Sequence, residues 1–348
     1  MLKKVVRIAA CLMAAAISIV SQTGCAGKEP VSATEFLLNT VCSITIYDEG
    51  SQKEREELIR QAFALSKEYE DRMSRTLAGS DINRLNKAEG KAVEVDPETA
   101  EVIREGVRYG ELSGGLFDIT VGGLTELWNF TGENPSVPSA EALAEAVAHV
   151  GYQKISVLPA EGDRGPWVRL SDPKTKLDLG GIAKGYIAGQ AAEYLRARGV
   201  KSAILNYGGN ITCIGGRAQG KPFRIGIEKP FSQDGGEAKA ILGTIEVSDM
   251  SVVTSGTYDR KFYEDGRLYY HILDPAAGYP KETDLDGVTI VGKSSADCDG
   301  LSTVSLMLGL EKGKAFIESL EGYEAIFVAK DGRIAVTDGL ADNFKPVE

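Results

Sequence analysis

Residues 178–186, with the sequence DLGGIAKGY, bring an acid, two adjacent glycines, a lysine and a third glycine close together. A turn that opens a helix presents free N–H groups to an anion, and Lys184 could add a point charge, so the stretch could hold a phosphate. It is neither GxxxxGK[ST], because Gly185 follows the lysine, nor GxGxxG. Asp178 would repel a phosphate and is better suited to a ligand hydroxyl or amide. Taken alone, the stretch could equally be a glycine-rich turn that packs a helix on a strand.

A second glycine-rich stretch is SGGLFDITVGGLTELWNF, residues 113–130. Two pairs of glycines bracket Phe117 and Asp118, and glycines beside an aromatic residue and an acid indicate a backbone that a ligand approaches closely. The alternative is a buried Phe117 with Asp118 capping the turn after it.

The stretch GKSSADCDGLSTVSLMLG, residues 292–309, places polar side chains where an apolar helix begins. Asp299 and Thr303 are four residues apart, so their oxygens would share one face of the helix. A carboxylate and a hydroxyl, with a backbone carbonyl and waters, suit Mg²⁺ rather than zinc or copper. N-capping by Asp297 or Asp299 is the alternative, and capping and metal binding could both hold.

Only two histidines occur, which argues against metal-bound hydrolysis with histidine ligands. His149 lies in an alanine-rich helical stretch and looks structural, whereas His271, in YYHILDPAAGYP, is expected on a strand that runs into a turn at the rim of a site. Packing is the alternative role for His271. Upstream, TSGTYDRKF adds Ser255, Thr257 and Arg260, which could face the same pocket. There is no GxSxG and no cysteine in an activating context, so a hydrolase triad is poorly supported.

Residues 1–24 look like a signal peptide. Lys3, Lys4 and Arg7 precede a 13-residue apolar run at 8–20, which is too short for a stable transmembrane helix. Small residues then precede Cys25, as at the cleavage site of a bacterial lipoprotein. We expect lipid on Cys25 and a tether over 25–35; ordinary secretion with cleavage nearby is the alternative. Either way, the domain is expected to work outside the cytoplasm.

The charge and the cysteines exclude several classes of function. The formal net charge is −11, and removal of the three leader cations leaves −14, so the protein should repel nucleic acid. Anionic lipid should repel it as well, so membrane attachment would come through Cys25. The remaining Cys42, Cys213 and Cys298 are odd in number and form no CxxC, which argues against disulfides and zinc. We expect them to be small buried side chains.

The pattern of apolar residues predicts an α+β fold with largely antiparallel sheets. A first strand is expected over 36–48, a loop around 79–86, and paired strands at 154–160 and 167–171. Helical spacing predicts helices over 53–74, 96–113, 139–149 and 187–198. From about residue 200 the period changes to two, with strands between Gly, Pro and Asp turns, and the chain ends with helices and a strand pair.

Six blocks occur in an order that resembles the ApbE family, the FAD:protein FMN transferases of bacterial envelopes. The blocks are SDINRLN, GGLFDITVGGL, LDLGGIAKGY, NYGGN, HILDPAAG and ADCDGLSTVSLMLG. The resemblance runs from about Phe36 to the C-terminus and implies an ApbE-like domain over 36–348, with mostly antiparallel sheets and flanking helices.

The resemblance also implies a reaction. FAD would bind with Mg²⁺ at its diphosphate, and a Ser or Thr hydroxyl of an acceptor protein would attack the riboflavin-side phosphate, which attaches FMN and releases AMP. Positioning and charge neutralisation do most of the work in such a transfer. A carboxylate or His271 would take the acceptor proton. Two alternative functions remain: an FAD pyrophosphatase that uses water in place of the acceptor hydroxyl, and a lipoprotein that binds flavin without catalysis.

Carried over residue by residue, the resemblance implies a metal site at the backbone carbonyl of Gly181 and the side chains of Asp299 and Thr303. Ser302 stands where some members have another acid. The implied FAD contacts are Leu38, Thr76, Leu116, Phe117, Asp118, Asp178, Lys184, Ile272 and Leu273. Leu38 stands where many members have Met, Thr76 where many have an aromatic residue, and Lys184 where some have Glu. The implied partner is an acceptor flavoprotein of an envelope electron-transfer system, with the enzyme lipid-anchored on the extracytoplasmic face of the cell membrane.

Overall fold

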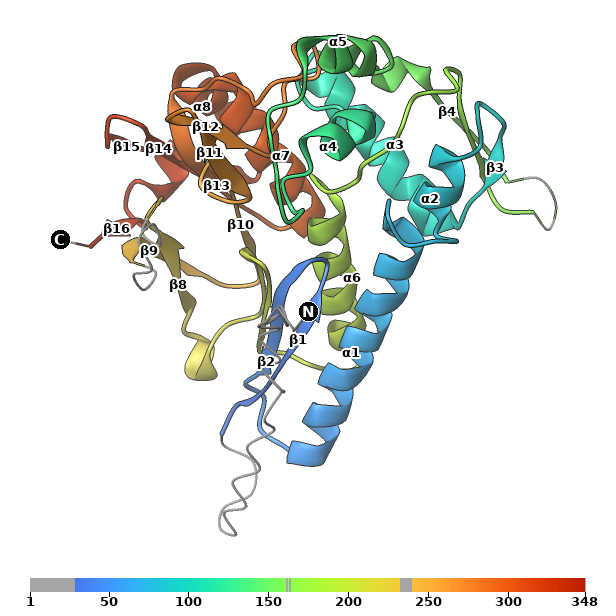
Figure 1. The fold of residues 1–348 in the computed structure, drawn as a ribbon. Coiled ribbons are helices and arrows are strands. Elements are labelled where there is room, and N and C mark those ends of the chain that lie inside the picture. Colours follow the sequence, from blue (N-terminus) through green and yellow to red (C-terminus); the bar gives the residue numbers. More distant parts are fainter. Residues whose placement is uncertain (1–28, 161, 163, 232–239, 348) are drawn as a thin grey trace, which may run out of the picture.

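The computed structural model describes residues 29–160, 162, 164–231 and 240–347. The expected signal peptide and Cys25 lie outside these residues. Within them, an eight-stranded antiparallel sheet forms the centre of the fold (Figure 1). Its order is β1 (Val31–Leu37), β2 (Thr40–Ile46), β6 (Ala203–Tyr207), β7 (Asn210–Ile214), β10 (Ser251–Gly256), β13 (Leu285–Gly292), β14 (Tyr323–Ala329) and β15 (Ile334–Val336).

Helices cover one face of this sheet. They are α1 (Gln52–Met73), α6 (Ala183–Ala197), α7 (Ser295–Leu308) and α8 (Leu310–Glu318). In Figure 1, α6 lies between α1 and α7, and α7 packs on β10 and β13. The amphipathic α1 has helically spaced buried residues: Arg55, Ile59, Ala62, Phe63, Ser66, Tyr69 and Met73. Apolar side chains of these helices and of the sheet form the main core.

A three-stranded sheet covers the other face of the central sheet. It consists of β8 (Phe223–Glu228), β9 (Ile241–Val247) and β16 (Lys345–Pro346), in the order β16-β9-β8. In FRIGIE of β8, buried and more exposed residues alternate, as the period-two pattern predicts. Its buried Phe223 and Ile225 join Val252 and Ile326 of the central sheet in a second core.

Further helices and small strands lie around the end of α6 where that helix begins (Figure 1). The helices are α2 (Asp81–Asn86), α3 (Pro97–Leu112), α4 (Gly122–Trp128) and α5 (Ala140–Ala148), with a short 3-10 turn at Tyr152–Lys154. Two other 3-10 turns, Ala218–Gly220 and Asp338–Leu340, lie elsewhere in the fold. The strands are β3 (Val93–Glu94), β4 (Ile155–Leu158) and β5 (Trp167–Leu170) in one small sheet, and β11 (Lys261–Glu264) and β12 (Arg267–Tyr270) in a hairpin. The predicted α+β class with mostly antiparallel sheets is confirmed.

The N-terminal boundary differs from the sequence prediction. Residues 31–35, which we expected in the tether, belong to β1, because Val31 to Leu37 pair residue by residue with β2. Leu38 and Asn39 form the turn between the strands, with φ of 56° and 55°. The chain is fixed even before β1, because the buried Arg55 guanidinium donates to the carbonyl of Glu29 at 2.9 Å.

Three helical segments also differ from the prediction. The expected loop at 79–86 contains α2, which starts where the Ser80 hydroxyl accepts from the N–H of Asn83 at 3.0 Å. Residues 122–128, for which no helix was expected, form α4. Helix α6 begins at Ala183 rather than at 187, so Lys184 lies in its first turn. No helix in the described part of the chain is long and apolar enough to span a membrane.

Candidate functional site

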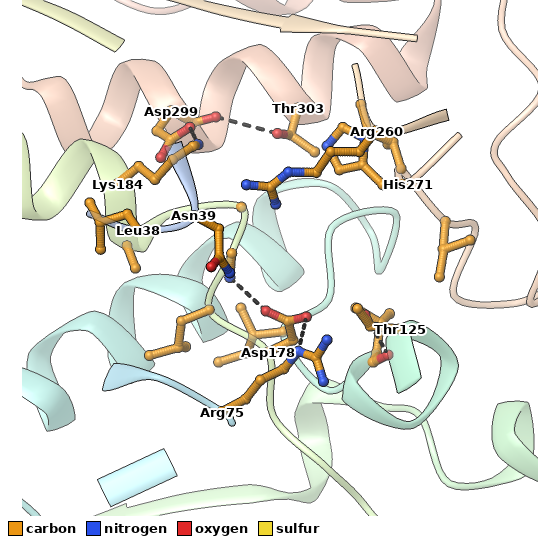
Figure 2. Close-up of a pocket in the computed structure, with 18 of the residues that line it drawn as sticks. Leu38, Asn39, Arg75, Thr125, Asp178, Lys184, Arg260, His271, Asp299 and Thr303 are labelled. Atoms are coloured by element: carbon orange, nitrogen blue, oxygen red, sulfur yellow. Dashed lines mark hydrogen bonds and ion pairs between the residues drawn. The ribbon is translucent and has the colours of Figure 1, made fainter. Parts of the chain in front are cut away.

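A cavity of about 300 Å³ lies at the start of α6, with walls from segments far apart in the sequence. It is lined by the turn at 38–39, the end of α1, the α7 helix and the segments at 116–121, 178–184 and 271–273 (Figure 2). Of the residues expected in the site, these line it: Leu38, Thr76, Leu116, Phe117, Asp118, Asp178, Gly181, Lys184, His271, Ile272, Leu273, Asp299 and Thr303. Ser302 does not line it.

At one corner of the cavity, α6 and α7 meet closely. The Asp299 carboxylate accepts from the backbone N–H of Gly185 at 2.8 Å and lies 3.4 Å from the Lys184 Nζ. Gly185 permits this approach, because a Cβ there would lie 2.3 Å from the Ser295 carbonyl oxygen and 2.6 Å from the Asp299 Cβ. The side chain of Asp299 is only 3% exposed, so a nearly buried carboxylate is held on the cavity wall with a lysine beside it.

One turn further along α7, Thr303 lines the cavity next to Asp299. Its hydroxyl lies 3.5 Å from the Asp299 carbonyl and 3.2 Å from the Ser255 hydroxyl of β10. Ser302 is instead fully buried, and its hydroxyl bonds to the Asp299 carbonyl at 2.8 Å and to the Ser255 hydroxyl at 2.7 Å. The geometry therefore does not support Ser302 as a metal ligand. Its position on the inner side of the helix makes it a support for Ser255, which lines the cavity.

Gly181 faces Phe117 across the same end of the cavity. A Cβ on Gly181 would lie 2.9 Å from the Phe117 ring, so the turn before α6 can pass this ring only as glycine. The Phe117 ring is held in turn by an edge contact with Tyr109, with centroids 5.7 Å apart. The two glycine-rich stretches thus pack against each other, Phe117 is buried as the alternative for the second stretch expected, and both stretches line the cavity.

The Asp118 carboxylate accepts hydrogen bonds from other residues of the protein. One oxygen accepts from the N–H and the hydroxyl of Thr120 at 2.8 and 2.6 Å, and the other accepts from the N–H of Tyr152 at 2.8 Å. Burial raises the pKa of Asp118, and the Thr120 hydrogen bonds oppose that rise. The side chain fixes the turn after it, as the capping alternative expected.

Asp178 has a partner that sequence reasoning did not select. The Arg75 guanidinium lies 3.1 Å from one carboxylate oxygen, and the N–H of Gly180 donates to the other at 2.8 Å (Figure 2). Arg75 follows α1 by two residues, and nothing in the local sequence connects it with a turn about one hundred positions away. The two contacts orient the Asp178 carboxylate on the cavity wall.

His271 follows β12 directly. Its Nδ1 lies 3.2 Å from the carbonyl oxygen of Asp259, which can only accept, so Nδ1 carries the proton of the neutral ring. Burial, with a further contribution from the Arg260 charge, lowers the pKa of His271 to about 3. Near neutral pH the imidazole is therefore uncharged, and its Nε2 can accept a proton.

Part of the cavity wall is apolar. Ile272, Leu273 and Phe130 line it, and Phe130 is stacked on the buried Trp128 with ring centroids 5.4 Å apart and planes 9° apart. Phe130 was not among the expected site residues. The cavity thus combines charged and hydroxyl groups at the α6–α7 corner with apolar and aromatic lining, a combination suited to a ligand with an anionic part and an aromatic part.

The ApbE family model matches residues 38–327. The chain belongs to the ApbE family. Among its relatives, a protein of Treponema pallidum named FAD:protein FMN transferase is 32% identical over 93% of this chain and 92% of its own length. A Klebsiella pneumoniae protein of the same name is 35% identical over 84% and 89%.

Solved ApbE structures share the fold. The ApbE protein of Thermotoga maritima superposes with a TM-score of 0.79 and 30% identity, covering 90% of this chain and 98% of that one. The flavinyl transferase ApbE of Pseudomonas stutzeri, in its apo form, gives 0.77 and 30% over 94% and 100%. The region that matches the ApbE family model contains every residue that lines the cavity.

Proposed function

We propose that this ApbE-family protein transfers the FMN moiety of FAD to a Ser or Thr hydroxyl of an acceptor protein, in an Mg²⁺-dependent reaction that releases AMP. The observation that carries the proposal is the α6–α7 corner, where Asp299, Thr303 and Gly181 line a cavity that is also lined by apolar and aromatic side chains. The shared name of the relatives in Treponema and Klebsiella supports it.

The residues at this corner fit Mg²⁺. A carboxylate, a hydroxyl and a backbone carbonyl are hard oxygen donors, which Mg²⁺ prefers, and no group of three or more His, Cys, Asp or Glu side chains in the described residues offers a site of another kind. The Asp299 charge is nearly buried, with the Lys184 ammonium beside it. When bound, Mg²⁺ would neutralise the charge of the diphosphate.

The chain's own residues would position the reactants. The apolar wall with Phe130 and Leu273 suits the flavin or the adenine ring, and Asp178, oriented by Arg75, can accept from a ligand N–H or hydroxyl. The neutral His271, with its proton fixed on Nδ1, would take the acceptor hydroxyl proton at Nε2.

Two other functions use the same cavity. Water in place of the acceptor hydroxyl would give FMN and AMP, and a lipoprotein could bind flavin without reaction. Purified protein incubated with FAD, Mg²⁺ and an acceptor fragment separates them when acceptor mass and AMP release are followed together. An FMN adduct with AMP supports transfer. FMN and AMP without adduct would replace transfer by hydrolysis, and no turnover would leave only flavin binding.

We propose further that the enzyme is anchored through lipid on Cys25 at the extracytoplasmic face of the cell membrane. Its partner there would be an acceptor flavoprotein of an electron-transfer system, and nucleic acid would not be a partner. The acidic charge and the leader-like N-terminal sequence support this. A Cys25→Ala protein should leave the membrane fraction; retention in that fraction would contradict the anchor.

A further inference from the structure

Arg260 differs from the other cationic side chains of the cavity. The Arg75 guanidinium pairs with Asp178 at 3.1 Å, and the Lys184 ammonium lies 3.4 Å from the Asp299 carboxylate. Arg260 lines the same cavity, and within the described part of the chain its guanidinium makes no hydrogen bond or ion pair. Its positive charge is therefore available to a ligand.

The turn between β10 and β11 holds Arg260 in place. At its base Thr257 is fully buried, and its N–H donates to the carbonyl of Asp286 at 2.9 Å. Arg260 itself has a φ of 41°, in the left-handed region that side chains rarely adopt. Such strained residues cluster at ligand sites, where the surrounding structure fixes them.

The side chain of Arg260 lies next to His271 and near the wall that carries Asp299 and Thr303 (Figure 2). Figure 2 shows its guanidinium directed into the cavity, with His271 beside it and with Asp299 and Thr303 on the neighbouring wall. The charge of Arg260 is close enough to His271 to lower the pKa of the imidazole. An anion bound at this part of the cavity would thus have both the Arg260 guanidinium and the His271 imidazole beside it (Figure 2).

We propose that Arg260 is a catalytic residue that binds the non-bridging oxygens of the transferred phosphate, the one on the riboflavin side of FAD. This rests on the proposed function. The acceptor oxygen forms a bond to that phosphorus, the bond to the AMP oxygen breaks, its electron pair leaves with AMP, and the acceptor proton goes to His271. Nucleophile and leaving group lie in line, so a cation beside the proton acceptor reaches the equatorial oxygens, where the transition-state charge is spread.

The same contact serves transfer and hydrolysis, because acceptor hydroxyl and water would attack the same phosphorus. We therefore measure total AMP release and FAD affinity in parallel, in the full-length protein with FAD and Mg²⁺. The variants are Arg260→Gln, Arg260→Lys and Arg260→Ala, the last also with added methylguanidinium. The matched control is Arg267→Gln in the adjacent strand, because Arg267 is 59% exposed, pairs with Glu282 at 3.4 Å and does not line the cavity.

We expect Arg260→Gln to lower kcat about 100- to 1000-fold, as the loss of one transition-state donor does in other enzymes, with a much smaller change in FAD affinity. Arg260→Lys should recover part of the rate, methylguanidinium should partly rescue Arg260→Ala, and the control should match wild type. A kcat of Arg260→Gln near that of wild type, an affinity loss as large as the rate loss, or absence of rescue in a folded Arg260→Ala protein would overturn the proposal. Wild-type protein that releases no AMP would reject the proposed function as well.

Discussion

The backbone N–H of Gly185 in α6 donates to the carboxylate of Asp299 in α7 at 2.8 Å. A helix N–H that would otherwise lack an intrahelical partner thereby orients an acid on the cavity wall. The contact needs a glycine in α6 and an acid in α7, and it joins the two segments that the sequence marks as glycine-rich turn and polar helix start. The shape of this corner of the cavity therefore depends on both residues.

Asp299→Ala should abolish metal-dependent turnover. Loss of groups that merely support metal ligands costs about 10- to 100-fold, so loss of a ligand should cost at least the upper end of that range. AMP release measured against Mg²⁺ concentration checks this. Asp297→Asn is the matched control on the same helix, because Asp297 does not line the cavity and accepts from Arg108 and Tyr323 at 2.6 and 2.7 Å. It should lose stability and keep its dependence on Mg²⁺. Unchanged turnover in Asp299→Ala would remove the metal assignment.

Gly185→Ala should destabilise the fold and weaken activity together. The added methyl group would lie 2.3 Å from the Ser295 carbonyl oxygen, so α6 and α7 must separate, at a cost of about 1–3 kcal/mol in the free energy of unfolding. Gly189→Ala is the control one turn later, where the nearest atom is the Ser295 Cβ at 3.9 Å. There we expect a gain of about 0.5–1 kcal/mol from helix propensity. Urea denaturation measures both, and equal effects would contradict the close packing of the two helices at Gly185.

His271→Ala should lower turnover more than FAD affinity, because the imidazole would act on the acceptor proton rather than hold the flavin. A variant in which affinity falls as far as turnover would make His271 a binding residue. Kinetics with flavin-fluorescence titration separate the two. A His271→Gln protein, which keeps a polar side chain without a proton-accepting nitrogen, should behave like the alanine variant in turnover.

The same histidine should make stability depend on pH. The folded state keeps the pKa of His271 at about 3, below the ordinary 6.5, so between these values the unfolded chain binds a proton that the folded protein does not. This contribution to stability is therefore present above about 6.5 and is lost as the pH falls toward about 3. The unfolding midpoint is measured at neutral pH and at a pH inside that window. Its fall between the two should be smaller in His271→Ala than in wild type. An identical loss would contradict the lowered pKa.

Asp118→Ala should cost stability rather than flavin binding. The substitution leaves the N–H and hydroxyl of Thr120 and the N–H of Tyr152 without their acceptor, which should lower the free energy of unfolding by about 1–3 kcal/mol. Asp118→Asn keeps one carbonyl oxygen and should lose less. Thermal unfolding measures the stability of the variants and FAD titration measures their affinity. A large loss of FAD affinity in a fully stable variant would make the Asp118 side chain a ligand contact.

Local sequence could predict most of the elements, and the resemblance to the ApbE family supplied most of the expected cavity residues. The period-two pattern after residue 200 predicted strands where β8 and β13 lie, and helical spacing predicted α1 and α3 to within a residue or two, because each signal lies within the segment itself. The short α2 and α4 were missed, since six or seven residues carry too little periodicity. For α2 the only local signal was the Ser80 cap.

The parts that could not be predicted depend on contacts between distant segments. Ser302 and Thr303 are neighbours with similar hydroxyls, and only the packing of α7 shows that one is buried behind Ser255 while the other lines the cavity. Arg75 gains its role from Asp178, far along the chain. The sequence placed Arg260 near the same pocket, but its lack of a carboxylate partner among the described residues is a property of the folded structure.

The early start of the first hairpin limits how far the enzyme can reach. Arg55 fixes the chain at Glu29, so in the lipid-anchored form that we propose the chain advances only four positions from Cys25 to the folded body. Fully extended, four positions span about 14 Å. The folded body would then stay tethered to the bilayer, with the cavity at the far end of α1 from the tether point, and acceptor sites held well beyond that reach would be out of range. Flexible residues inserted after Cys25 should widen the set of acceptors that become flavinylated.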